Sequence, residues 1–171
     1  MTSTLFTDLL NDLFVSREGQ TPDRMLRDFL SFTPTAHVVR TQSGVRFFTR
    51  CALDALLAAW ILDENLEIET LPPGDTSPLR LTVRHGQLHA PEGAVLTFPE
   101  RPDTDTAGEI HETFCPYVNV FPDEQAHQTW TPISPVPTTT IRLQDAFSIS
   151  QDLVDRLAYL SVLEEHGGGC C

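Results

Sequence analysis

The most apolar run of the chain, residues 51–62, carries a thiol and a carboxyl in its first turn. Residues 45–48 are mostly β-branched or aromatic, as in a strand, and the alanines and leucines that follow favour a helix beginning near Cys51. Cys51 and Asp54 would then lie on one face of this helix, one above the other. The helix macrodipole favours a thiolate at Cys51, and the Asp54 carboxyl in apolar surroundings is expected to hold its proton more tightly than it would in water. A buried structural cysteine and an aspartate suited to a helix N-terminus explain the same pattern without any chemistry.

The remaining pattern predicts helices and strands that are segregated along the chain rather than strictly alternating. Helices are expected at 4–15, 21–32, 123–130 and 143–165, and strands at 37–40, 45–48, 66–70, 79–84, 94–98, 109–121 and 138–143. Cys115 falls in the middle of the segment 109–121, and Pro116 lacks a backbone donor, so we expect Cys115 at a bend, bulge or edge. The pattern predicts an α+β fold in which small antiparallel or mixed β-sheets pack with helices.

The chain divides into three parts by composition. Residues 1–35 form a short helical segment, and residues 36–165 hold the strands together with the apolar helix. Residues 166–171 end in Gly-Gly-Gly-Cys-Cys, a flexible tether carrying two adjacent thiols.

The charge balance argues against nucleic-acid partners. Of 171 residues, 11 are Lys or Arg and 24 are Asp or Glu, giving a net charge of -13, which repels phosphate backbones. No stretch has the length of a membrane span and no signal peptide is visible, so we expect a cytoplasmic protein without membrane partners. The four cysteines are expected as thiols, and without a Cys-x-x-Cys pair an ordinary structural zinc site has no support.

Four segments, in one order, resemble the organomercurial (alkylmercury) lyases. Residues 47–56, Phe-Phe-Thr-Arg-Cys-Ala-Leu-Asp-Ala-Leu, resemble that family's aromatic–x–Trp–Cys–Ala–Leu–Asp–Thr–Leu segment. Residues 112–121, Glu-Thr-Phe-Cys-Pro-Tyr-Val-Asn-Val-Phe, resemble its Phe-Cys-x-x-Val-x-Phe-Phe segment. Residues 79–83 fall where the family has Ser-Leu-Thr-Val, and residues 145–151 are similar to its Glu-Ala-Phe-Gly-Leu-Gly-Gln. The resemblance covers residues 37–160, and the two cysteine segments as a pair are its most specific part.

The resemblance implies an enzyme that cleaves carbon–mercury bonds by protonolysis, giving a hydrocarbon and Hg(II) in mercury detoxification. Cys51 and Cys115 match the family's two catalytic cysteines, and Asp54 matches its catalytic carboxylate. Mercury is a soft ion whose natural ligands are thiolates, so the resemblance implies that Cys51 and Cys115 bind it, with Asp54 as a further ligand. The Asp54 carboxyl would also supply the proton that the carbon receives. The reaction implied requires no cofactor, only excess thiol for turnover. The expected partners are an organomercurial substrate, cellular thiols and a mercuric reductase that accepts Hg(II).

Three departures from the family limit this transfer. Only about 36 residues precede the first hairpin, so we expect the family's N-terminal helical region to be reduced here. A third family cysteine, thought to be structural, has no counterpart, because Pro72 stands near its place. Arg50 replaces the Trp before the first cysteine, and a cation there could lower the pKa of Cys51 or alter access for alkyl groups.

The tail and the thiol pair leave other interpretations open. Cys170 and Cys171 could bind mercury leaving Cys51 and Cys115 or hand it to a partner; equally, they could be a disordered end without a role. The main alternative for the whole chain is a non-catalytic soft-metal (Hg or Cu) binding protein or metallochaperone of the same fold. Asp54 favours the enzyme, because a chaperone needs the thiols but no proton donor. A regulator with a helical DNA-binding region is disfavoured by the negative net charge.

Overall fold

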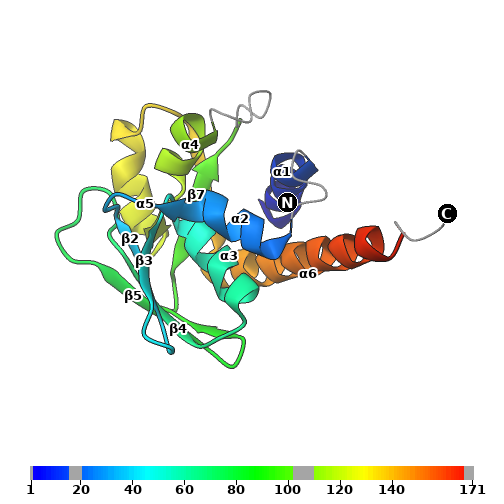
Figure 1. The fold of residues 1–171 in the computed structure, drawn as a ribbon. Coiled ribbons are helices and arrows are strands. Elements are labelled where there is room, and N and C mark those ends of the chain that lie inside the picture. Colours follow the sequence, from blue (N-terminus) through cyan, green and yellow to red (C-terminus); the bar gives the residue numbers. More distant parts are fainter. Residues whose placement is uncertain (1, 16–20, 102–109, 168–171) are drawn as a thin grey trace.

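The computed structural model describes residues 2–15, 21–101 and 110–167. Two antiparallel sheets and six α-helices make up the fold in these ranges (Figure 1). The larger sheet has the order β1-β3-β2-β4-β5-β6, and the smaller has the order β8-β7-β9. The helices are α1 (Thr2–Val15), α2 (Pro22–Phe29), α3 (Ala52–Leu62), α4 (Ile110–Thr113), α5 (Glu124–Trp130) and α6 (Leu143–Gly167). The strands of the larger sheet are β1 (Leu30–Ser31), β2 (His37–Thr41), β3 (Arg46–Thr49), β4 (Leu66–Thr70), β5 (Leu79–Arg84) and β6 (Gln87–His89), and those of the smaller are β7 (Val95–Pro99), β8 (Val120–Phe121) and β9 (Thr138–Arg142).

Helix α3 is the centre of the molecule. Every residue from Ala52 to Ala59 is buried, because α3 packs against α2, α6 and the inner face of the larger sheet. Trp60 fixes α3 to α6: its ring stacks on Phe147 with centroids 4.3 Å apart, and its indole N–H donates to the Phe147 carbonyl oxygen at 2.9 Å. The start of α3, where Cys51 lies, is thereby held deep in the core.

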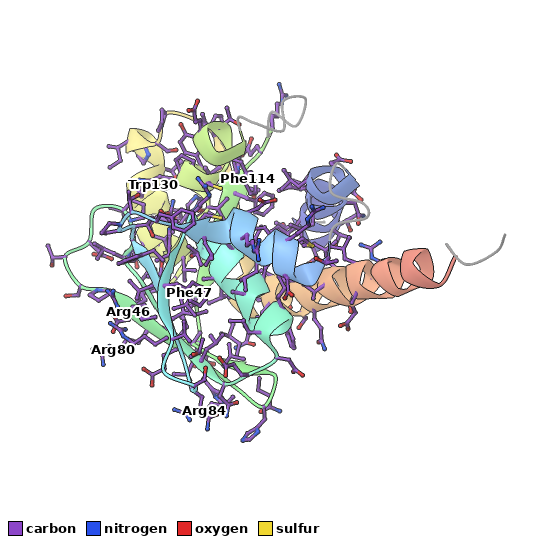
Figure 2. All side chains as sticks on the ribbon, viewed as in Figure 1. Arg46, Phe47, Arg80, Arg84, Phe114 and Trp130 are labelled. Carbon is purple, nitrogen blue, oxygen red and sulfur yellow. The ribbon has the colours of Figure 1, made fainter. Side chains whose placement is uncertain are left out.

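The inner and outer faces of the larger sheet differ as period-two alternation predicts. Ile68 and Leu81 pair across β4 and β5 and are buried against α3. Arg46, Arg80 and Arg84 project from the outer side, away from α3 (Figure 2). The larger sheet is therefore covered by helix α3 on its inner face, while its outer face carries charged side chains.

Helices α1 and α2 belong to the same core as the sheets. Phe6 on α1 is fully buried with its ring 5.2 Å from that of Phe98 on β7. Met25 and Phe29 on α2 are buried in the same apolar cluster as Cys51. Within the described ranges, no helix is both long enough and apolar enough to cross a membrane.

The predicted α+β class is confirmed, and all strand pairs are antiparallel. The hairpin before Cys51 is also confirmed, with Gly44 at φ 94° in its turn, a conformation that suits glycine. The helix predicted at 21–32 starts as expected, with Thr21 as N-cap, but ends at Phe29 because the next two residues pair with β3. Residues 87–89 form a strand, β6, that the sequence did not indicate.

The strand predicted over 109–121 is wrong. Residues 110–113 form the short helix α4, residues Cys115–Tyr117 form a 3-10 turn (η1), and only Val120–Phe121 pair as a strand. Pro116 explains the difference, since it has no N–H to give a ladder and its fixed φ suits the first turn of a helix. The expectation that Cys115 lies at a bend is confirmed.

Candidate active site

Cys51 lies where β3 ends and α3 begins. It is the N-cap residue of α3, in extended conformation, and its side chain is fully buried. The hydroxyl of Thr49, also fully buried, donates to the Cys51 carbonyl oxygen at 2.9 Å. The sequence did not indicate this role of Thr49. A threonine at the end of a strand is common, and nothing else in the local sequence points to it. The backbone around Cys51 is therefore fixed from both sides.

Asp54 turns back toward Cys51 from the third position of the helix. Its carboxylate accepts a hydrogen bond from the Cys51 backbone N–H at 3.2 Å, and its own backbone N–H faces the Cys51 sulfur, as in a capping box. The side chain is 6% exposed. The predicted placement of the thiol and the carboxyl on one helix face is therefore what the structure has.

Cys115 approaches this pair from the turn η1 and is also buried. The backbone N–H of Ala52, the residue after Cys51, donates to the Val118 carbonyl oxygen at 3.3 Å. This bond joins the start of α3 directly to the segment that follows Cys115. Two stretches about sixty residues apart in sequence thereby meet.

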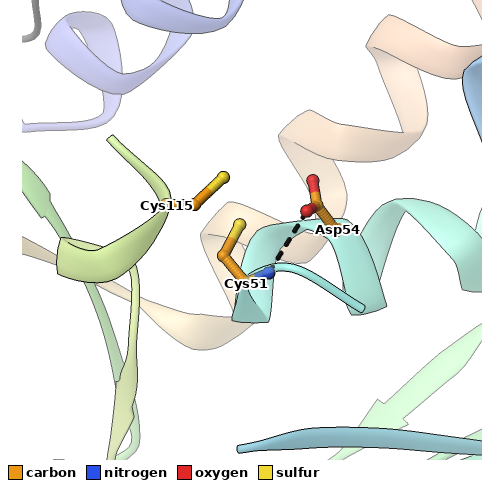
Figure 3. A group of neighbouring side chains, drawn as sticks. All are labelled: Cys51, Asp54 and Cys115. Atoms are coloured by element: carbon orange, nitrogen blue, oxygen red, sulfur yellow. Dashed lines mark hydrogen bonds between the residues drawn. The ribbon is translucent and has the colours of Figure 1, made fainter. Parts of the chain in front are cut away.

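The three side chains form one compact group. One ligand atom from each of Cys51, Asp54 and Cys115 lies within 4.8 Å of the other two (Figure 3). Metal–thiolate bonds are about 2.3 Å long for zinc, so two sulfurs at this spacing can contact one soft ion. The carboxylate stands close enough to exchange a proton with either sulfur or with a group bound to them. Two soft ligands and one proton carrier are thus combined in the buried core.

The pKa of Cys51 is raised well above its ordinary value, mainly because burial disfavours the thiolate. The hydrogen bond to Cys115 and the negative charge of Asp54 act in the same direction, while the Asp54 backbone N–H opposes them. The helix N-terminus does favour the thiolate, through the Asp54 backbone N–H, but desolvation outweighs this effect and the pKa of Cys51 is raised overall. Arg50 does not compensate, because its exposed side chain donates to the Asp28 carbonyl oxygen at 3.1 Å.

Cys170 and Cys171, the other two candidate metal ligands, lie outside the described residues. Among the described residues, the group of Cys51, Asp54 and Cys115 is the one cluster of cysteine, histidine and acidic side chains with metal-ligand spacing. Of the histidines whose side chains the structure describes, His37, His85, His89 and His127, none joins this group.

Comparisons with known proteins identify relatives of this chain. A family model described as "MerB: Alkylmercury lyase" matches residues 30–155. An alkylmercury lyase of Streptomyces lividans is 27% identical over 146 residues, and the match spans 83% of this chain but 63% of that protein, somewhat under two thirds of its length. The crystal structure of the mercury-bound form of MerB2 superposes with a TM-score of 0.65 over 92% of this chain and 100% of that one, at 18% identity, which shows a shared fold. Because the family model spans most of the chain, including all three clustered side chains, this protein belongs to the alkylmercury lyase family.

Proposed function

We propose that the protein is an organomercurial lyase that cleaves carbon–mercury bonds by protonolysis, releasing a hydrocarbon and Hg(II). The observation that carries this proposal is the buried cluster of two thiols and one carboxyl within 4.8 Å of one another. Membership of the alkylmercury lyase family supports the same reaction. Mercury enters as part of the substrate, and the chemistry needs no redox-active cofactor.

In the first step Cys51 takes the organomercurial from a carrier thiol. The sulfur–mercury bond to the carrier breaks as the bond to Cys51 forms. The raised pKa of Cys51 means that it reacts from the thiol form, so its proton must leave as mercury arrives. Asp54, whose carboxylate lies in the same capping box, receives this proton.

In the second step Cys115 joins the mercury and the carbon leaves. The second sulfur donates charge to mercury and polarises the carbon–mercury bond, and Asp54 delivers its proton to the carbon. The carrier departs in the first step as a thiolate and takes up the proton that Cys115 loses on binding mercury. One thiol proton therefore ends on the hydrocarbon and the other on the carrier thiol. Hg(II) remains on Cys51 and Cys115, so turnover requires thiols that remove it.

Asp54 separates this proposal from a soft-metal chaperone or scavenger. Two thiolates suffice to hold Hg(II) or Cu(I), and a buried carboxylate beside them adds repulsion rather than affinity. Its position beside both thiols suits a group that must take up and give back a proton. Cellular thiols and a mercuric reductase are the proposed acceptors of the product, the cytoplasm is the proposed compartment, and Cys170 and Cys171 are proposed to assist the transfer.

The test is a cleavage assay with purified full-length protein, phenylmercuric acetate and excess thiol. We expect benzene in the headspace and inorganic Hg(II) in solution, in equal amounts and over many turnovers. Cys115→Ser should abolish turnover, whereas replacing Cys170 and Cys171 by Ser should mainly slow product removal. Tight mercury binding without hydrocarbon would overturn the lyase and indicate a metal-binding protein instead.

A further inference from the structure

Thr97, at the centre of β7, holds the segment that carries Cys115 through three hydrogen bonds. Its hydroxyl accepts from the Asn119 backbone N–H at 3.1 Å and donates to the Tyr117 carbonyl oxygen at 2.8 Å. Its backbone N–H donates to the Asn119 carbonyl oxygen at 2.9 Å. A regular ladder would have joined the Asn119 N–H to a backbone carbonyl, so the hydroxyl replaces the ladder where the chain turns away. Thr97 is fully buried, and water cannot substitute for it.

Asn119 completes the attachment from within the segment. Its side-chain amide, 6% exposed, donates to the Pro116 carbonyl oxygen at 3.1 Å. This bond closes the turn that begins at Cys115, next to the bonds from Val118 N–H to the Cys115 carbonyl oxygen and from Tyr117 N–H to the Phe114 carbonyl oxygen.

The same segment is tied to Cys51. The carbonyl oxygens of residues 116, 117, 118 and 119 all accept hydrogen bonds, and the donor for Val118 is Ala52 N–H at the start of α3. A continuous set of bonds therefore runs from β7 through residues 116–119 to the residue after Cys51. The separation of the two sulfurs depends on this set, because η1 is a three-residue turn with little stiffness of its own.

We propose that Thr97 and Asn119 are positioning residues that set the spacing of Cys51 and Cys115 for simultaneous binding of one soft metal ion. The expected effect on the cleavage rate rests on the proposed lyase function. The expected effect on the spacing of the two sulfurs follows from the hydrogen bonds alone. Each acts through the backbone of residues 116–119, which directly follow Cys115.

The consequence of losing these bonds follows from how narrow the productive geometry is. Removing the Thr97 hydroxyl leaves the buried N–H of Asn119 and the part-buried carbonyl of Tyr117 without that partner, so the turn must shift to satisfy them. A misplacement of about 1 Å can cost about a hundredfold in rate. The step that should slow is the one in which both sulfurs bind the mercury, because Cys115 would be displaced. Cys51 itself stays in place, since its hydrogen bonds to Thr49 and Asp54 are unchanged.

The experiment compares Thr97→Val with Thr97→Ser in the full-length chain whose Cys170 and Cys171 are replaced by Ser, so that the tail thiols give no signal. Thr97→Val keeps the shape and loses the hydroxyl, and Thr97→Ser keeps the hydroxyl. We expect Thr97→Val to lower kcat/KM for phenylmercuric acetate by about ten- to a hundredfold. The ultraviolet charge-transfer band of Hg(II) on two thiolates should weaken, and Hg(II) should be lost to lower concentrations of competing thiol. Thr97→Ser should restore both measurements to within a few fold of the parent.

Thr138→Val is the matched control. It removes another buried threonine hydroxyl in the same sheet, one that pairs with His127 Nε2 at 3.0 Å rather than with the Cys115 segment. Equal losses of kcat/KM and of the dithiolate band in Thr138→Val and Thr97→Val would overturn the inference, because a general loss of stability would then explain both. Parent-like values of both measurements in Thr97→Val would overturn it as well. A parent protein that fails to cleave, while the dithiolate band responds to Thr97 as expected, would refute the lyase and leave the positioning role intact.

Discussion

At the scale of single residues, one capping box serves both structure and chemistry. The Asp54 carboxylate accepts from the Cys51 N–H and thereby satisfies a helix-terminal donor in the core. The same contact keeps the carboxylate beside the Cys51 thiol, whose pKa is raised by burial and by that charge. A residue that stabilises the helix start is therefore already in position to take the thiol proton.

Asp54→Asn should separate these two roles. The amide oxygen can still accept from the Cys51 N–H, so the helix start is kept, but the side chain can no longer carry a proton between sulfur and carbon. We expect Hg(II) binding close to that of the parent and a loss of about 10²- to 10⁴-fold in the rate of hydrocarbon release, the range of general-acid catalysis. Single-turnover release of benzene from protein-bound phenylmercury measures the chemical step directly. Parent-like release in this variant would remove Asp54 from the mechanism.

The sequence pointed to the three clustered side chains but not to the residues that hold them in place. Cys51 and Asp54 are three positions apart, and the family segments point to Cys115, so local spacing and resemblance were enough. Thr97 and Asn119 are twenty-two residues apart and carry no local pattern. Nor did the sequence reveal the protonation of Cys51, since the macrodipole can be inferred from a helix start whereas complete burial depends on elements far away in the chain.

At the scale of elements, strong periodicity predicted the helices and most strands, and the exception is the segment with Cys115. Residues 109–121 contain the β-branched and aromatic residues of a strand, yet only Val120–Phe121 pair as one. The proline at position 116 and the side-chain bonds of Asn119 and Thr97 favour a turn over a ladder. Tertiary contacts therefore outweigh the strand propensity of this segment, and the backbone around Cys115 is irregular.

Helix α1 should contribute to stability as part of the main core. Phe6 is fully buried against Phe98 on β7, so Phe6→Ala should lower the free energy of unfolding by about 3–5 kcal/mol. Leu5→Ala on the same helix is the control: Leu5 is 45% exposed, and its replacement should change stability by about 0.5 kcal/mol or less. Urea unfolding followed by circular dichroism measures both. Similar small effects of the two substitutions would mean that α1 is not part of the cooperative core.

At the scale of the whole molecule, the site is built where independent layers converge. The larger sheet supports the back of α3, α6 holds its side through Trp60, and the smaller sheet carries the Cys115 segment. The thiols and the carboxyl are therefore part of the packed interior rather than of a surface loop, and both cysteines belong to the same apolar cluster as residues of α1 and α2. Stability and site geometry should respond together to conditions that loosen this interior.

Acid should destabilise the fold partly through His37, which joins two strands of the larger sheet. His37 on β2 is buried, its Nδ1 lies 2.8 Å from the Thr70 hydroxyl on β4, and burial lowers its pKa from 6.5 to about 4. The unfolded chain therefore takes up a proton on His37 at a higher pH than the folded protein does. The destabilisation that results is absent above pH 6.5 and grows as the pH falls toward 4. Full development corresponds to about 3 kcal/mol. His37→Asn, which keeps a polar partner for Thr70 without titrating, should lose less stability than the parent between pH 7.5 and 4.5 in urea unfolding. Equal losses in the two proteins would assign the acid sensitivity to other groups, of which His127, whose pKa is also lowered by burial, is the next to replace.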